Sequence, residues 1–192
     1  MFYWTICTLL WIASKFVYRI KVSGTENIPD EGAFILCSNH IHSYDPAILA
    51  IHIKRQLRFM AKKELFDFKF KGAFFRAMGA FPVDRGAADM ASYRNAMNEL
   101  ATGMGFLIFS QGTKMQTLDI KGAKGGAALF GIKSEVPVIP AGISGTYRAF
   151  STINVRFGKA ISLKEYYGMR LKTTQIDEIM SKIMAEVEKL VL

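Results

Sequence analysis

The stretch Ser-Asn-His-Ile-His-Ser-Tyr-Asp-Pro at residues 38–46 decides how this chain is interpreted. The apolar run at residues 33–37 precedes it and predicts a buried strand. Residues 46–51 follow it and predict a helix that has proline in its first turn. His40 is therefore expected at the end of a strand and Asp45 near the start of a helix, with four residues between them. A turn of that length can fold the carboxylate of Asp45 back onto the ring of His40.

A histidine and an aspartate in contact can work as a proton-transfer pair. The carboxylate fixes which ring nitrogen carries the proton and leaves the other nitrogen free to accept one. Without a nucleophilic side chain, the pair suits a reaction in which the substrate supplies its own hydroxyl. Two other interpretations stay open: a satisfied polar histidine beside an aspartate that caps a helix, and metal binding by His40, His42 and Asp45. We predict no metal site, because no Cys, His or Glu elsewhere completes an obvious ligand set.

The composition indicates one domain that meets an anionic membrane surface. The 192 residues are 51% hydrophobic and carry a formal net charge of +9, and the mean hydropathy is +0.17. Nucleic-acid binders are usually basic but polar, whereas an apolar and basic chain favours lipid. Residues 54–76 hold eight basic and two acidic residues, a net +6 of the total. Cys7 and Cys37 lie in apolar runs without disulfide or metal spacing, which predicts a reducing, cytoplasmic compartment.

Two segments are candidates for membrane contact. Residues 2–20 predict a helix that is apolar almost all round, and Lys15 and Arg19 interrupt the apolar surface before it reaches the length of a full span. No signal-peptide features accompany it. We expect this helix to lie in one leaflet, with a full span and an ordinary buried helix as alternatives. Residues 66–76 place five phenylalanines among basic residues, a pattern that also fits core phenylalanines with solvated lysines or a single-stranded nucleic-acid groove. The predicted membrane contacts are Trp4, Trp11, Phe68, Lys69, Phe70 and Lys71.

The rest of the chain alternates strands with helices. This pattern predicts a mixed α/β fold with a mostly central β-sheet flanked by helices. Strands are expected at residues 20–23, 57–61, 79–83, 105–109, 136–142 and 153–157, and helices at 87–101, from 124 onward and at the carboxyl end. In the last helix, Thr174 with Asp177 resembles a capping box. Polar clusters follow three strands, and ligands favour such strand ends in α/β sheets. The clusters are His40 with Asp45, then Arg85, then Gly112, Thr113 and Lys114.

Taken in order, these clusters resemble the glycerolphosphate/lysophosphatidic acid acyltransferase family. The resemblance covers about residues 35–142. The four blocks are Asn39, His40 and Asp45 of Asn-His-x4-Asp; Gly79 to Arg85; Phe109 to Lys114, where the family has Phe-Pro-Glu-Gly-Thr-Arg; and Val136 to Pro140.

The resemblance implies transfer of an acyl group from a thioester of acyl-carrier protein or coenzyme A to the 2-hydroxyl of 1-acyl-glycerol-3-phosphate. His40 would be the general base, Asp45 would orient it, and no acyl-enzyme, metal or redox cofactor is required. The product would be phosphatidic acid, and the enzyme would be peripheral or monotopic on the cytoplasmic face of the cell membrane. Residues 1–20 would be the membrane-associating helix and residues 21–192 the acyltransferase domain. The implied substrate-binding residues are Arg85, Gln111, Gly112, Thr113 and Lys114, of which Arg85 and Lys114 would hold the phosphate.

The third block departs from the family pattern. Ser110 replaces proline, Gln111 replaces glutamate and Lys114 replaces arginine. Glutamine keeps the size of glutamate but loses its charge, and lysine loses the bidentate fork that suits phosphate. A different lysophospholipid acceptor and a catalytically weakened lysophospholipid-binding protein therefore stay open. A basic nucleic-acid-binding domain is the remaining alternative, and we expect no nucleic-acid partner.

Overall fold

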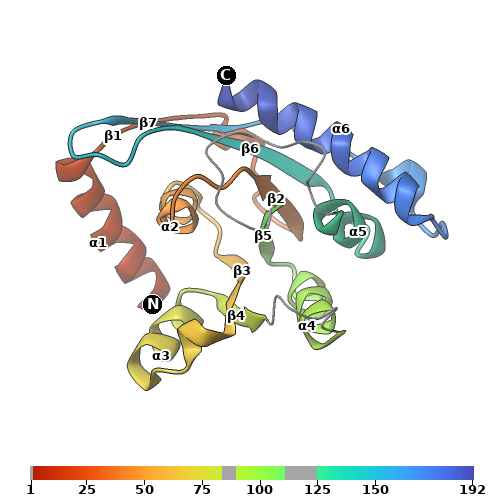
Figure 1. The fold of residues 1–192 in the computed structure, drawn as a ribbon, viewed down its shortest axis with the longest axis horizontal. Coiled ribbons are helices and arrows are strands. Elements are labelled where there is room, and N and C mark those ends of the chain that lie inside the picture. Colours follow the sequence, from red (N-terminus) through yellow and green to blue (C-terminus); the bar gives the residue numbers. More distant parts are fainter. Residues whose placement is uncertain (1, 84–89, 111–124) are drawn as a thin grey trace.

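A computed structural model of the chain describes residues 2–83, 90–110 and 125–192. Its strands form one sheet, and its helices lie around that sheet (Figure 1). The strands are β1 (Arg19–Ser23), β2 (Phe34–Ser38), β3 (Leu57–Lys62), β4 (Ala80–Val83), β5 (Gly105–Phe109), β6 (Val138–Gly145) and β7 (Thr152–Phe157). The helices are α1 (Phe2–Val17), α2 (Asp45–Ala50), α3 (Lys69–Ala77), α4 (Met90–Ala101), α5 (Gly126–Lys133) and α6 (Thr173–Val191), with short 3-10 turns η1 (Thr25–Asn27), η2 (Lys63–Phe66) and η3 (Lys164–Tyr166).

The sheet brings the carboxyl ends of five strands to one edge. Its order is β1-β7-β6-β2-β5-β3-β4. Strands β6, β2, β5, β3 and β4 run parallel, β7 is antiparallel to β6, and β1 is parallel to β7. The predicted α/β class with a central sheet flanked by helices is thus confirmed. The segments that follow β2, β5 and β6 all leave the sheet at the same edge.

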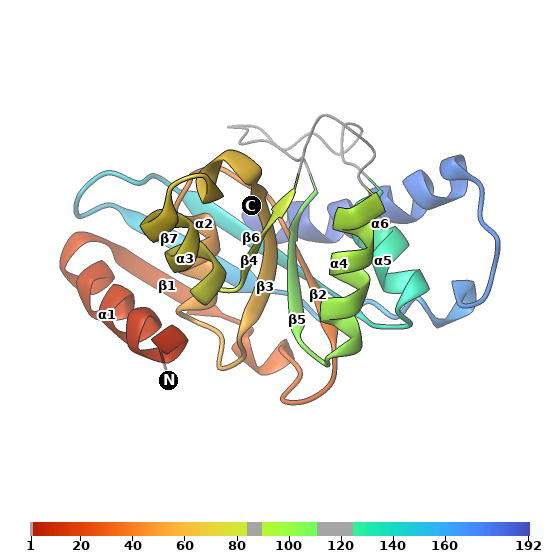
Figure 2. The same cartoon turned by 90° about the horizontal axis from the view of Figure 1, so that it is seen from below.

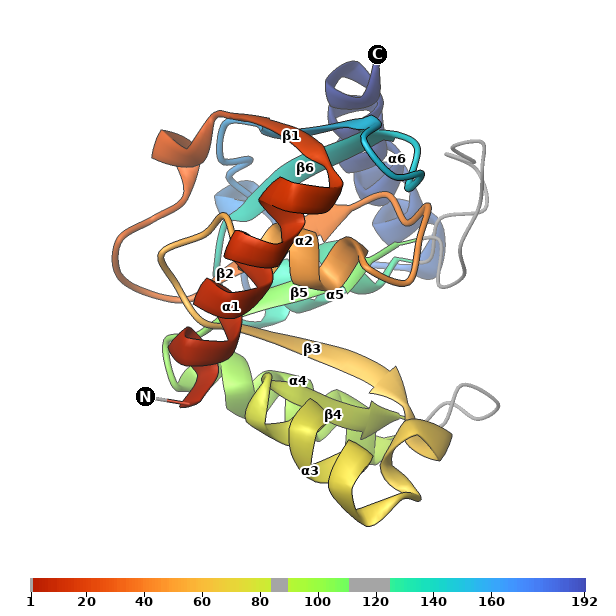
Figure 3. The ribbon, with the colours of Figure 1, turned by 90° about the vertical axis from the view of Figure 1, so that its left-hand side faces the viewer.

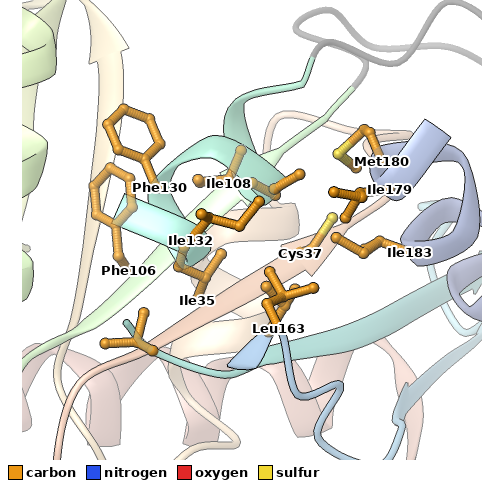
Figure 4. Close-up of a cluster of buried hydrophobic side chains, with 14 of the residues drawn as sticks. Ile35, Cys37, Phe106, Ile108, Phe130, Ile132, Leu163, Ile179, Met180 and Ile183 are labelled. Carbon is orange, nitrogen blue, oxygen red and sulfur yellow. The ribbon is translucent and has the colours of Figure 1, made fainter. Parts of the chain in front are cut away.

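Strand β2 lies at the centre of the sheet and is buried on both faces. Ile35 and Cys37 face a core built with α4, α5 and α6, whereas Phe34 and Leu36 face a second core that includes α2. Figure 4 shows the first core, and Figure 2 shows α4, α5 and α6 on one side of the strands with α1 and α3 on the other. Burial on both faces explains why this strand is a continuous apolar run and not an alternating one.

Helix α1 packs at one side of the sheet and is shorter than the predicted helix over residues 2–20. Its buried Tyr3 and Cys7 contact Met78, and α1 and α3 both face the viewer in Figure 3. The helix ends at Val17 because the backbone N–H of Arg19 donates to the carbonyl of Ser151, 2.9 Å away, and β1 begins there beside β7. None of the described helices is both long and apolar enough to cross a bilayer.

Two other local expectations differ from the structure. The N-cap of α6 is Lys172, so Thr174 and Asp177 lie inside the helix and do not form its predicted capping box. The backbone N–H of Lys172 donates to Gln175 Oε1 at 2.9 Å, and the extended backbone of Lys172 lets the helix begin at Thr173. Within the phenylalanine-rich segment, residues 69–77 form α3, a helix that the alternation of rings and cations did not predict.

Gly142 on β6 lets α6 lie directly against the sheet. A Cβ atom at this position would come within 2.6 Å of the backbone of Leu190. We predict that Gly142→Ala destabilises the protein by about 1–3 kcal/mol, since the last turn of α6 must move away. Thermal unfolding should show this as a melting temperature lower by roughly 2–4 °C per kcal/mol.

Gly126→Ala is the matched control for that substitution. Among the described residues, the atom nearest to a Cβ there is Phe130 Cε2, 4.0 Å away. This variant should melt at or above the wild-type temperature, because alanine favours helix more than glycine does. Equal melting temperatures for Gly142→Ala and wild type would contradict the close packing of α6.

Candidate active site

The predicted contact between His40 and Asp45 is present at the carboxyl end of β2. His40 follows β2 in the loop, and Asp45 is the first residue of α2. His40 Nδ1 lies 2.8 Å from Asp45 Oδ2. The loop between them is short, so the two side chains are held together by local chain geometry.

The carboxylate of Asp45 is fully buried and is surrounded by hydrogen-bond donors. Oδ2 also accepts from the backbone N–H groups of Ile41, at 2.6 Å, and His42, at 2.8 Å. Oδ1 accepts a short hydrogen bond from the hydroxyl of Tyr147. A carboxylate bonded in this way is the acceptor for His40, so Nδ1 carries the ring proton and Nε2 presents a lone pair. Among the described residues none forms a hydrogen bond with Nε2 of His40.

The ring of His40 is also fixed by an aromatic neighbour. It stacks on Phe109, the last residue of β5, with 4.1 Å between the ring centroids and 21° between the planes. The side chain of His40 is only 12% exposed. Its orientation is therefore set by a hydrogen bond at one ring edge and by a stacked ring on one face. Phe109 belongs to the third sequence block, but nothing in its pattern indicated that it would contact His40.

Asn39 joins the end of β2 to β6. Its side-chain amide donates to the carbonyl of Ile143 and its side-chain carbonyl accepts from the N–H of the same residue, both at 2.8 Å. The two strands pair only as far as Ser38 and Ala141, so Asn39 extends their pairing past the last strand residue. This clamp holds β6 beside the loop of residues 39–44.

Tyr147 follows β6 and was not predicted from the sequence. Its ring stacks on His42, with centroids 4.2 Å apart and planes at 17°, and meets Tyr18 edge-on at 5.7 Å. Burial, followed by the negative charge of Asp45, raises the pKa of Tyr147 well above its usual range. The phenol therefore stays protonated at neutral pH and acts as a donor. The sequence carried no signal for this contact, because 102 residues separate Tyr147 from Asp45.

The other predicted substrate-binding residues, Arg85 and 111–114 (Gln111, Gly112, Thr113 and Lys114), lie outside the described residues. Strand β4 ends at Val83 and β5 ends at Phe109, both at the sheet edge that carries His40. The roles assigned to these residues stay predictions. In the described ranges, no group of three or more His, Cys, Asp or Glu side chains could hold a metal ion.

Residues 19–144 match the family described as Acyltransferase. The chain belongs to this family. The match confirms the resemblance inferred from the four sequence blocks. It includes His40, Asp45, β5 and most of β6.

Several relatives are named 1-acyl-sn-glycerol-3-phosphate acyltransferase. The protein of Bacillus subtilis is 33% identical over 127 residues, which cover 66% of this chain and 63% of the relative. The protein of Streptococcus pneumoniae is 28% identical over 173 residues, which cover 86% of this chain and 64% of the relative. The chain thus spans just under two thirds of the length of these relatives. The crystal structure of the 1-acyl-sn-glycerophosphate acyltransferase of Thermotoga maritima has a similar fold, with a TM-score of 0.69 at 21% identity, covering 98% of this chain and 77% of that one.

Both cysteines are buried, which bears on whether the protein can carry the acyl group itself. Cys37 lies three residues before His40, but it is fully buried, and its sulfur is 2.8 Å from Ser110 Oγ. Burial raises the pKa of the Cys37 thiol to about 12 and also raises that of Cys7. Both thiols therefore remain protonated at neutral pH, where only the thiolate would be nucleophilic.

We predict that neither cysteine reacts with a thiol reagent in the folded protein between neutral and mildly alkaline pH. A colorimetric disulfide reagent should release almost no dye from native protein and should report both thiols after denaturation in guanidinium chloride. Rapid labelling of Cys37 in the native state would contradict its burial.

Proposed function

We propose that this protein transfers a fatty acyl group from an acyl thioester to the 2-hydroxyl of 1-acyl-glycerol-3-phosphate, giving phosphatidic acid. The donor would be carried by acyl-carrier protein or coenzyme A. The observation that carries the proposal is the pairing of His40 Nδ1 with the buried Asp45 carboxylate at 2.8 Å. That pairing makes Nε2 of His40 the proton acceptor of the site.

The chemistry needs one base and no covalent intermediate on the protein. Nε2 of His40 takes the proton of the 2-hydroxyl while the hydroxyl oxygen bonds to the thioester carbonyl carbon. The tetrahedral intermediate collapses with cleavage of the carbon–sulfur bond. The leaving sulfur receives the proton from His40, so an ester and a free thiol are formed and the base is regenerated. Asp45 keeps the proton on Nδ1 and stabilises the imidazolium that forms during the reaction.

The choice of acceptor is supported by the names of the relatives and by the expected cations of the site. The relatives from Bacillus subtilis and Streptococcus pneumoniae are named for 1-acyl-sn-glycerol-3-phosphate. Arg85 and Lys114 would bind its phosphate. Gln111 and Lys114 depart from the family pattern, and they favour two alternatives: another lysophospholipid as acceptor, or a binder with weak catalysis.

The first test is thioester turnover in mixed micelles with and without 1-acyl-glycerol-3-phosphate. Acceptor-dependent thiol release is expected from wild type. His40→Ala should lose roughly 10²–10⁴-fold of the rate, the usual contribution of a general base. Asp45→Asn should also be slow, because the amide no longer enforces the proton on Nδ1.

His52→Gln is the matched control, since His52 lies after α2 and its Nδ1–H donates to the carbonyl of Ile48, the one hydrogen bond of this ring to the described residues. This variant should stay within a few-fold of wild type. Full turnover by His40→Ala would exclude His40 as the base. Thiol release only in the presence of another lysophospholipid would identify that lipid as the acceptor. Binding of lysophosphatidate without thiol release would favour the alternative of a binder with weak catalysis.

We further propose that the protein docks on an anionic membrane, on its cytoplasmic face, through α1 and α3. On α1, Trp4 and Trp11 are partly exposed, and on α3 Phe70 is 90% exposed. Phe68 is exposed just before α3, and Lys69 and Lys71 are exposed on the helix. Rings of this kind gain free energy by entering the acyl region, while the lysines meet lipid phosphates.

Vesicle sedimentation tests the docking surface. The double variant Lys69→Gln, Lys71→Gln should bind anionic vesicles more weakly. The loss of binding free energy should be about 1 kcal/mol per lysine, which is roughly a thirtyfold lower affinity for the pair. Phe68→Ser with Phe70→Ser should weaken binding to anionic and neutral vesicles alike.

The matched control for the lysines is Lys182→Gln with Lys189→Gln. These residues are exposed on α6, which lies away from α1 and α3 (Figures 1 and 3). The control should bind as wild type does. Equal losses in the α3 and α6 variants would show that net charge alone matters and would contradict a defined docking face.

A further inference from the structure

We propose that Tyr147 is a positioning residue for acyl transfer: its hydroxyl holds Oδ1 of Asp45, and through Asp45 it keeps His40 in the tautomer that accepts a proton. The inference rests on the proposed function for its kinetic consequence. Its structural consequence, the protonation pattern of the His40 ring, can be measured without any substrate.

The two oxygens of the Asp45 carboxylate have different partners. Oδ2 binds the ring of His40 and the backbone N–H groups of Ile41 and His42. Among the described residues, Tyr147 is the single partner of Oδ1. The Asp45 side chain has no exposed surface, so water has no ready access to replace a lost donor. Without the phenol, one oxygen of a buried anion would lack a hydrogen bond, which is costly.

Tyr147 is itself held in place from several sides. Its ring lies between the stacked ring of His42 and the edge-on ring of Tyr18. Strand β6, which ends two residues before Tyr147, is fixed to the loop of His40 by the two hydrogen bonds of Asn39 with Ile143. The hydroxyl therefore approaches Asp45 from a rigid frame, as a positioning group must. The raised pKa of Tyr147 means that it remains a donor throughout the neutral range.

Loss of this donor has a defined consequence for His40. The carboxylate can turn or take up a proton to satisfy Oδ1, and either change weakens its hold on Nδ1–H. The neutral ring would then populate the tautomer with the proton on Nε2, which cannot accept a proton from the substrate hydroxyl. Because Tyr147 acts through Asp45 and not on the substrate, the loss should appear in kcat and not in KM.

The test compares Tyr147→Phe with Tyr18→Phe. The first variant keeps the stacked ring and removes only the hydroxyl, and the second removes a hydroxyl from the ring that packs against Tyr147. Ring-nitrogen NMR of the substrate-free protein, at a pH where His40 is neutral, should show the Nδ1–H tautomer in wild type and Tyr18→Phe. Tyr147→Phe should show a mixture of tautomers. Its kcat should fall by about ten- to a hundredfold, part of the roughly 10²–10⁴ that a general base supplies, with KM within about twofold.

Each result decides the matter. An unchanged ring-nitrogen spectrum in Tyr147→Phe would overturn the proposal. So would a change in KM with kcat unaltered, or an equal fall of kcat in Tyr18→Phe. If wild type transfers no acyl group, the proposed function fails, but the NMR comparison still shows whether Tyr147 controls the His40 ring. Thermal unfolding of both variants confirms that the comparison is made between folded proteins.

Discussion

The buried carboxylate of Asp45 is the constraint on which the site depends. A charge removed from water is stable only when its oxygens receive hydrogen bonds. Here the donors are the ring of His40, two backbone N–H groups of the same loop and the hydroxyl of Tyr147. The first three can come from a single short turn, but the fourth needs a distant strand. The site is therefore complete only when β6 has docked beside β2.

The ends of β2 and β6 are held together by side-chain hydrogen bonds. β2 stops at Ser38, whereas β6 continues four residues past Ala141, the last residue that pairs with β2. Asn39 bonds both backbone groups of Ile143 and so carries the pairing into the catalytic loop. Since β2 is buried on both faces, the two cores fix its position. The position of the His40 ring, the proposed base, therefore depends on packing that lies well away from that ring.

The parts of this arrangement that the sequence predicted are local. His40 and Asp45 are five residues apart, and strand and helix signals on either side limited how the loop could fold. Tyr147 and Phe109 reach the same loop from β6 and β5, and no short-range pattern encodes such contacts. The end of α1 was misplaced for a related reason: pairing with Ser151, far along the chain, ends the helix before its apolar pattern ends. The start of α6 was misassigned because only the extended backbone of Lys172 shows that the helix begins at Thr173.

The same geometry argues for a substrate-borne nucleophile. Cys37 and Ser110, two nucleophilic side chains beside the loop, contact each other in the core and are both buried. Nε2 of His40 has no hydrogen-bond partner among the described residues and can accept a proton, and the stack on Phe109 keeps the ring in place. Tyr18, the residue directly after α1, contacts the ring of Tyr147, and Tyr147 in turn donates to Asp45. The end of the proposed membrane helix therefore lies close to the His40–Asp45 pair. An acceptor whose acyl chain stays in the bilayer would therefore have only a short distance to cover before its hydroxyl meets the base.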